Sequence, residues 1–199
     1  MGTSSTIGFF DAQFGRQVKA GDFALNPFES AALPHLRGAV LEYGCGLGNL
    51  ALAAAERGCE VTAMDASAAA IEHLNAEAAK RGLALHVVQA DLRDYRLAAD
   101  FDAVVCIGLL MFFDCPTAFA QLDMLQAHVV PGGLAIVNVL VEGTTYLDMF
   151  DASGHCLFAP GELDRRFAGW QILSSEHADF PARDGLLKSF ATITARKPS

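Results

Sequence analysis

From residue 39 onward, short apolar runs alternate with stretches in which apolar side chains recur at helical spacing. This alternation is typical of repeated βα units. The apolar runs predict strands at residues 39–43, 59–64, 83–89, 101–107, 134–141, 170–175 and 189–196. The other stretches predict helices at 26–36, from the turn after the first strand to about 57, at 67–81, from 116 onward and, briefly, from 160 onward.

The last two predicted strands are joined by a segment that contains Pro181 and Gly185 and has no helical pattern. Because parallel neighbours need a long crossover, these two strands are expected to pair antiparallel. Most of the earlier strands are separated by helices, and these strands should lie parallel. The expected fold class is therefore α/β, with a doubly wound, Rossmann-like, seven-stranded, mainly parallel sheet and an antiparallel last strand.

Charge and hydropathy exclude two classes of partner. The chain has 23 acidic and 14 basic residues, a net charge of -9, and no basic stretch, so no nucleic acid partner is expected. The longest apolar run, residues 103–113, is far shorter than the roughly 20 residues of a membrane span, so no membrane association is expected. The first residues lack the basic start and long apolar core of a secretory signal, which predicts a cytoplasmic protein.

The five cysteines are odd in number, and no two of them form a C-x-x-C pair. We therefore expect buried free thiols in a reducing cytoplasm, and neither a zinc site nor a redox pair. The cysteines are Cys45, Cys59, Cys106, Cys115 and Cys156.

A glycine-rich turn follows the first predicted strand and leads directly into a helix, with Gly44, Gly46 and Gly48 at every second position. Glycines permit a positive φ and let a ligand approach the backbone N–H groups at the helix start. The dinucleotide fingerprint requires its third glycine where Asn49 stands, which argues against NAD. The turn is thus expected to bind a nucleotide-like ligand of another kind.

Acidic residues stand at the ends of the first three strands. Glu42 can balance a cationic amine or sulfonium, although a salt-bridged strand end is an alternative. Asp65 can accept both hydroxyls of a ribose, or can cap the next helix together with Ser67. Asp91 and the Leu92 N–H can bond an adenine edge, although Asp91 can instead cap a helix.

These motifs, together with Pro131-Gly132-Gly133 after the fourth strand, resemble those of class I S-adenosylmethionine-dependent methyltransferases over residues 39–141. The resemblance implies S-adenosylmethionine as cofactor and S-adenosylhomocysteine as product. It implies that the glycine turn and Glu42 line the methionine and ribose moieties and that Cys106 and Ile107 supply backbone near the methionine amine. The implied cofactor-binding residues are Glu42, Gly44, Cys45, Gly46, Gly48, Asp65, Asp91, Leu92, Cys106 and Ile107.

A narrower resemblance, to the tellurite-resistance methyltransferases, extends through Leu110-Met111-Phe112 to the C-terminal part. Those enzymes carry a His-Arg pair before the last strand that is associated with their anionic substrate. Here Arg183 is present in that loop and the histidine is missing, which puts tellurite itself in doubt. Arg183 is a candidate for binding an anionic acceptor, the alternative being a surface pair with Asp184 or Asp179.

Other chemistry finds little support in the sequence. The six histidines form no H-x-x-x-H motif, and the acidic residues show no metal-loop spacing, so no metal is expected. No G-x-S-x-G motif occurs, and no catalytic residue is assigned. Phe112 and Phe113 can form a substrate wall or simply the core, and Phe9, Phe10 and Phe14 can form a lid or simply pack.

The sequence thus predicts one methyltransferase domain over residues 1–199, acting on a small-molecule acceptor that can be anionic, such as tellurite, selenite or a carboxylate. Its expected parts are an N-terminal lid or helical segment (1–38), a cofactor-binding core (39–141), and a substrate loop with a terminal β-hairpin (142–199). The acceptor pocket is expected from residues 142–160 and 179–187. The alternatives are an NAD(P)-dependent reductase and a binding module that holds an adenosyl ligand without catalysis.

Overall fold

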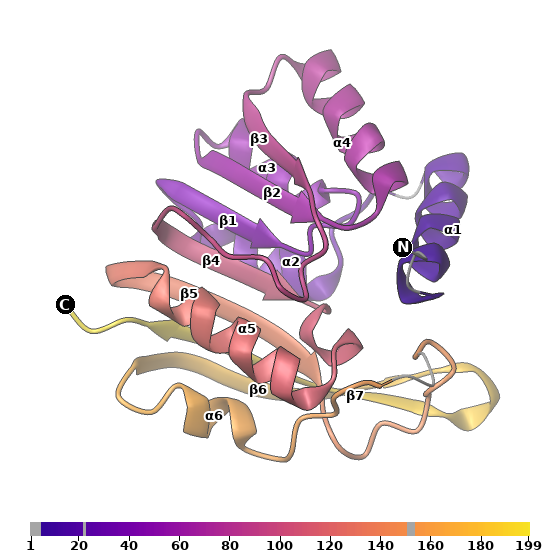
Figure 1. Cartoon of the computed structure of the whole chain (residues 1–199), viewed down its shortest axis with the longest axis vertical. Helices are drawn as coiled ribbons and strands as arrows, with labels where there is room; N and C mark the ends of the chain where they lie inside the picture. The colour runs from indigo at the N-terminus through magenta and orange to yellow at the C-terminus, as the bar shows by residue number, and fades with distance from the viewer. Residues whose placement is uncertain (1–4, 22, 151–153) are drawn as a thin grey trace.

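The computed structural model describes residues 5–21, 23–150 and 154–199, and within them not the side chains of residues 5–7 and 9. Seven strands form one sheet in the order β3-β2-β1-β4-β5-β7-β6 (Figure 1). The strands are β1 (Ala39–Tyr43), β2 (Glu60–Asp65), β3 (Leu85–Gln89), β4 (Phe101–Ile107), β5 (Val129–Leu140), β6 (Gln171–Pro181) and β7 (Leu187–Arg196). The helices are α1 (Ser5–Ala20), α2 (Pro27–Ala32), α3 (Asn49–Glu56), α4 (Ala68–Arg81), α5 (Cys115–Ala127) and α6 (Glu162–Arg166), with short 3-10 turns η1 (Leu33–His35), η2 (Leu110–Phe112) and η3 (Arg183–Gly185).

The pairing of the strands confirms the predicted fold class. β1 pairs parallel with both β2 and β4, and β3 and β5 extend the parallel sheet on either side. β7 runs antiparallel between β5 and β6, as the helix-free connection predicted. The strand order reverses between β1 and β4, and in doubly wound sheets ligands bind beyond the carboxyl ends of the strands at such a point.

Alternating side chains of β1 supply both sides of the core. Leu41 and Tyr43 pack with Leu122 and Leu125 of α5 on one face of the sheet. Val40 packs on the other face, in the cluster that includes residues of α3 and α4. Helices therefore cover both faces (Figure 1), as the period of two along a strand requires when both faces are buried.

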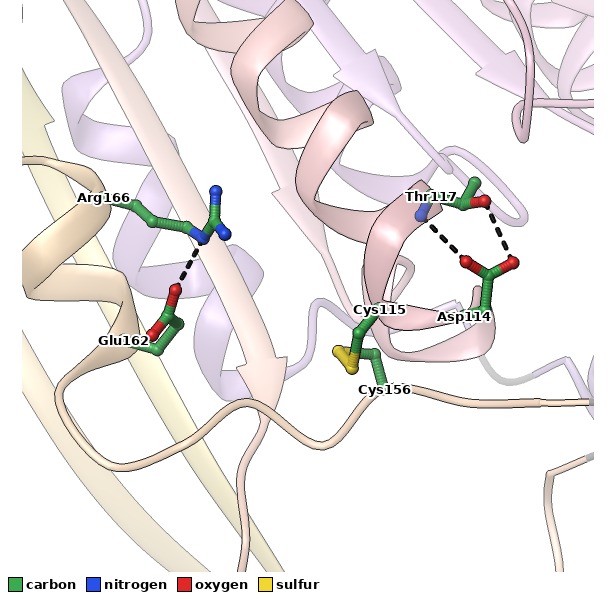
Figure 2. Close-up of a disulfide and its surroundings, with 6 residues drawn as sticks. All are labelled: Asp114, Cys115, Thr117, Cys156, Glu162 and Arg166. Carbon is green, nitrogen blue, oxygen red and sulfur yellow. Dashed lines mark hydrogen bonds and ion pairs between the residues drawn. A yellow bond between two sulfur atoms is a disulfide. The ribbon is translucent and has the colours of Figure 1, made fainter.

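Several helix ends follow their predicted local chemistry. Ser67 is the N-cap of α4, its hydroxyl accepting from the Ala70 N–H at 3.2 Å, and Gly82 ends that helix in the left-handed conformation. Asp114 caps α5 by accepting from the Thr117 N–H at 2.9 Å, with Pro116 in the first turn as expected (Figure 2). These ends are fixed by side chains within three residues of the cap, which is why the sequence revealed them.

Other boundaries differ from the prediction. β5 begins at Val129 and runs through the Pro-Gly-Gly segment, whereas the sequence suggested a start at residue 134. β6 continues to Pro181, well past residue 175, as an exposed edge strand whose mixed side chains give little apolar signal. The helix predicted at 26–36 is divided into α2 and η1, with Pro34 in the second piece.

The prediction of five free thiols is wrong for two cysteines. Cys115, the first residue of α5, forms a disulfide with Cys156, and their Cα atoms are 4.7 Å apart (Figure 2). The two residues are 41 positions apart in sequence, so only the return of the chain after β5 brings them together. Cys45, Cys59 and Cys106 are free and buried, as expected.

Candidate functional site

A cavity of about 660 Å³ opens at the carboxyl ends of β1, β2 and β4. Its wall is formed by the glycine turn after β1, by the residues that follow β2, β3 and β4, and by α1 and the start of α2. The volume is within the range of small-molecule sites. The cavity thus lies where the reversal of strand order leads one to expect a ligand.

The glycine turn has a backbone that other residues would strain. Gly46 and Gly48 have φ values of 51° and 72°. A Cβ atom on Gly48 would lie 2.5 Å from a Leu74 methyl carbon, and one on Gly46 would lie 3.1 Å from the Phe14 ring. Glycine is favoured at both positions because the φ values are positive and because side chains of α4 and α1 occupy the space that a Cβ atom would need.

Asp65, at the end of β2, is fastened to this turn. One carboxylate oxygen accepts from the Gly46 N–H at 2.8 Å, and the other accepts from the Ser67 N–H at 2.9 Å. Burial raises the pKa of Asp65, and these backbone bonds partly offset that rise. Asp65 thus helps to hold the start of α4, as one of its two predicted roles requires, and it also lines the cavity.

Glu42 is a buried acid with one carboxyl oxygen that lacks a partner. Its side chain is only 6% exposed, and Oε2 accepts no hydrogen bond. Among the residues that the structure describes, none forms an ion pair with Glu42, so the salt-bridge alternative is wrong. Burial raises its pKa well above the ordinary range, and the nearby carboxyls of Glu29 and Asp65 add to this effect. An unsatisfied buried carboxyl in a cavity wall is typical of a ligand site.

Glu42→Gln is expected to stabilise the ligand-free protein at neutral pH. Between the ordinary pKa of glutamate and the raised pKa of Glu42, the unfolded chain has released a proton that the folded protein retains, so stability falls as pH rises. Glutamine removes this loss. The melting temperature of the variant should therefore exceed that of the wild type by a difference that grows as the pH rises above the ordinary pKa of glutamate, by about 2–4 °C for each kcal/mol gained.

Thermal melts by circular dichroism at several pH values measure this difference. A constant offset between the two proteins across the range would contradict the assigned protonation of Glu42. Cofactor titration of the same variant should show weaker binding, because the carboxyl that faces the cavity is gone.

The residues after β3 form the next part of the wall. Asp91 lies on the cavity and holds the Arg93 guanidinium, with Nε 2.9 Å from Oδ1, and this pair lowers the pKa of Asp91. No helix begins in this stretch, so the helix-capping alternative for Asp91 is wrong. Leu92 is buried, and its carbonyl accepts from the Tyr43 hydroxyl at 2.9 Å.

Two predicted residues at the end of β4 differ in position. Ile107 lines the cavity, whereas Cys106 is fully buried in the core and is not part of the wall. Successive side chains of a strand point to opposite faces, which explains the difference. Cys45, in the glycine turn, does line the cavity.

Aromatic rings cover the outer side of the cavity. Phe10 and Phe14 of α1 lie with ring centroids 5.7 Å apart, and Phe10 meets Phe112 edge to face at 4.8 Å. Phe112 and Phe113 both line the cavity, and Phe113 also belongs to the core. The side chain of Phe9 lies outside the described part of the structure.

The helix α1 is held in place from the α4 side. The Ser67 hydroxyl donates to the Asp11 carboxylate, and α1 packs beside α4 (Figure 1). The ring of Phe14 thus lies against Gly46 of the glycine turn, and Phe10 and Phe14 both line the cavity.

Glu29 is a cavity residue that the sequence did not single out. It closes a capping box at the start of α2, where its Oε2 accepts from the Asn26 N–H at 2.8 Å while Asn26 Oδ1 accepts from the Glu29 N–H at 2.9 Å. Burial raises the pKa of Glu29. The Asn-x-x-Glu spacing predicts a helix start, but nothing local reveals that α2 lies against the cavity.

Arg183 lies away from this cavity. Its guanidinium pairs with Asp148 and is 63% exposed, and it lies 5.6 Å from the centre of the Tyr146 ring. The predicted partners Asp179 and Asp184 are therefore both wrong. Of the segments 142–160 and 179–187, only Gly154 is among the described residues that line the cavity, and residues 151–153 lie outside the described structure.

Comparison with known proteins agrees with the geometry. Residues 40–133 match a family described as a methyltransferase domain. Hemagglutinin 1 of Eikenella corrodens is 30% identical over an alignment of 169 residues that covers 79% of this chain and 54% of that protein. The ubiquinone biosynthesis O-methyltransferase of Rickettsia canadensis is 30% identical over 101 residues, 51% of this chain and 42% of that protein. The chain thus spans about half the length of these curated relatives.

Among solved structures, TehB from Haemophilus influenzae matches with a TM-score of 0.77 and 21% identity, covering 91% of this chain and 65% of TehB. Other structures with this fold contain bound S-adenosylmethionine or S-adenosylhomocysteine. Within the described ranges, no helix is long and apolar enough to cross a membrane. Nor do the described His, Cys, Asp and Glu residues gather in groups of three or more that could hold a metal ion.

Proposed function

We propose that this chain, which belongs to the class I S-adenosylmethionine-dependent methyltransferases, transfers a methyl group from S-adenosylmethionine to a small-molecule acceptor. The observation that carries the proposal is the cavity at the reversal of strand order, which is lined by the glycine turn, Asp65 and Glu42, whose Oε2 accepts no hydrogen bond. The single domain over residues 1–199, with its three predicted parts, belongs to the same proposal.

The cavity wall suits this cofactor chemically. A buried carboxyl with an unsatisfied oxygen, such as that of Glu42, can balance a cation, and the sulfonium and amine of S-adenosylmethionine are cationic. Asp65 supplies acceptors at the end of β2, where a ribose binds in doubly wound folds, and Asp91 and Leu92, which also line the cavity, are the residues proposed to bind adenine. Gly44, Cys45, Gly46, Gly48 and Ile107 complete the proposed cofactor wall, and Cys106, which the resemblance implied as a backbone contact, is not among the residues that line the cavity.

When bound, S-adenosylmethionine supplies an electrophilic methyl group on its sulfonium sulfur. The chain's own contribution is to orient the reactants and exclude water, which together account for much of the rate in reactions that need no protein nucleophile. The rings of Phe10, Phe14 and Phe112 are the groups placed to exclude water from the outer side.

Calorimetric titration with S-adenosylhomocysteine, S-adenosylmethionine and NADH tests the proposal and its alternatives. We expect heat with the first two ligands and none with NADH. Binding of NADH alone would favour the reductase. Binding of S-adenosylmethionine without turnover of any acceptor would favour a non-catalytic module.

The identity of the acceptor remains a proposal of smaller scope. This chain covers only part of TehB and part of the ubiquinone biosynthesis O-methyltransferase, so the names of those two proteins do not identify its acceptor. The hypothesis of an anionic acceptor depended on Arg183, whose charge is paired with Asp148 outside the cavity. We therefore propose a small-molecule acceptor whose charge matches the residues that line the cavity.

The predicted cytoplasmic location and the absence of a nucleic acid partner also remain proposals. The net charge of -9 supports the proposal that the protein has no nucleic acid partner. A disulfide is less usual in a reducing compartment. Thiol titration of protein from cell extracts under non-reducing conditions therefore tests the cytoplasmic location.

A further inference from the structure

The charges on the cavity wall are strongly one-sided. Among the described lining residues the only basic side chain is Arg93, and it is already paired with Asp91. The lining acids are Glu29, Glu42, Asp65, Asp91 and Asp114. Asp91 is paired, and burial raises the pKa of Glu29, Glu42 and Asp65, so a cationic ligand in the cavity would stabilise the ionised form of these carboxyls whereas an anion would not.

The part of the wall not assigned to the cofactor combines a carboxyl with aromatic rings. Glu29 contributes the carboxyl, and Phe10, Phe14 and Phe112 contribute the rings. Aromatic faces attract cations through the ring quadrupole and pack well against apolar carbon. This combination fits a ligand with a positive charge and an apolar body.

The same wall is unfavourable for an anion. A carboxylate or oxyanion would lose its water beside Glu29 and Glu42, and no free cationic side chain among the described lining residues would replace that water. The burial that raises the pKa of Glu29 also means that a positive neighbour would be stabilising there.

Building on the proposed methyltransferase function, we infer that the acceptor is a hydrophobic amine whose positive charge is held by Glu29 and whose apolar body packs on Phe10, Phe14 and Phe112. The amine arrives as an ammonium ion and loses one proton to solvent water, which frees the nitrogen lone pair. The lone pair then forms a bond to the methyl carbon as the carbon–sulfur bond breaks, with its electrons remaining on sulfur. The products are an N-methylated ammonium ion and neutral-sulfur S-adenosylhomocysteine.

Three matched probes test the inference: phenethylamine, phenethyl alcohol and hydrocinnamate, which share a phenyl ring and a short chain but are cationic, neutral and anionic. Each is titrated into the wild-type protein saturated with S-adenosylhomocysteine. We expect phenethylamine to bind at least about tenfold more tightly than hydrocinnamate. With S-adenosylmethionine, mass spectrometry should detect the N-methylated amine.

Glu29→Gln isolates the proposed charge effect. Glutamine also serves at the third position of a capping box, so the start of α2 is preserved. The variant should bind phenethylamine about tenfold more weakly while its affinities for phenethyl alcohol and S-adenosylhomocysteine change less than about twofold. The matched control is Glu60→Gln, which makes the same change of charge on an exposed residue at the opposite end of β2 and should leave all affinities unchanged.

The outcomes separate the inference from the proposed function. Equal or tighter binding of hydrocinnamate, absence of phenethylamine binding, or an equal effect of Glu29→Gln on amine and alcohol would overturn the amine acceptor while S-adenosylhomocysteine still binds. Failure of the wild type to bind S-adenosylhomocysteine would instead overturn the methyltransferase proposal.

Discussion

Loss of the disulfide between Cys115 and Cys156 is expected to lower the free energy of unfolding by about 4 kcal/mol. The bond closes a loop across a sequence separation of 41, and a cross-link of this length removes considerable conformational freedom from the unfolded chain. For a protein of this size, the melting temperature should fall by roughly 8–16 °C.

Contacts around the bond should keep the reduced protein folded. Glu162 Oε1 accepts from Arg166 Nε at 2.8 Å (Figure 2). The Arg166 guanidinium also lies 3.6 Å from the centre of the Phe119 ring, which joins α6 to α5. Asp114 and Thr117 independently cap α5. The loss should therefore appear as a shift of one cooperative transition.

Differential scanning calorimetry of the wild type with and without dithiothreitol measures the effect. The double variant Cys115→Ser/Cys156→Ser is the control, since it should melt at the reduced temperature and not respond to dithiothreitol. Thiol titration in denaturant should count three free thiols before reduction, corresponding to Cys45, Cys59 and Cys106. Identical melts of the oxidised and fully reduced wild type would contradict the prediction.

Asp65→Ala is expected to weaken the binding of S-adenosylhomocysteine at least tenfold. A charge-assisted hydrogen bond contributes roughly 1.5–3 kcal/mol, and about 1.4 kcal/mol corresponds to one decade of affinity. The substitution also removes the acceptor of the Gly46 and Ser67 N–H groups, so the glycine turn loses the hydrogen bond that joins it to the end of β2. Both effects reduce affinity in the same direction.

Isothermal titration calorimetry measures this change, and circular dichroism checks that the variant is folded. Asp65→Asn retains one oxygen acceptor and should lie between the wild type and alanine. Asp164→Ala, on the exposed side of α6, is the matched control. An unchanged dissociation constant in folded Asp65→Ala would limit Asp65 to holding the start of α4.

Much of the fold, and the part of the cavity wall formed by the glycine turn and Asp65, was predictable because the sequence patterns that determine them are local. Gly46 and Gly48 mark a turn that only glycine tolerates, and Asp65 stands at the end of the next strand. Ser67 and Pro116 mark helix starts through chemistry confined to one turn. In each case the residues that determine the structure are neighbours in the sequence, so a pattern of a few residues contains the information.

The part of the cavity wall formed by α1 and α2 could not be predicted in the same way. The spacing of Asn26 and Glu29 predicts a helix start, but its place beside Glu42 depends on how α2 packs ahead of β1. The position of Phe14 over Gly46 depends on the packing of α1 beside α4. Neither packing is encoded by a periodicity, because the contacting residues lie tens of positions apart.

By itself, the sequence determined the order of strands and helices, the glycine turn and the acidic strand ends, since each follows from periodicity or backbone sterics over a few residues. Only the tertiary structure decided that Cys115 meets Cys156, that Arg183 pairs with Asp148, and that Glu29 joins the cavity. These contacts form after the chain has reversed direction around the sheet, and their partners are selected by the packing of whole elements.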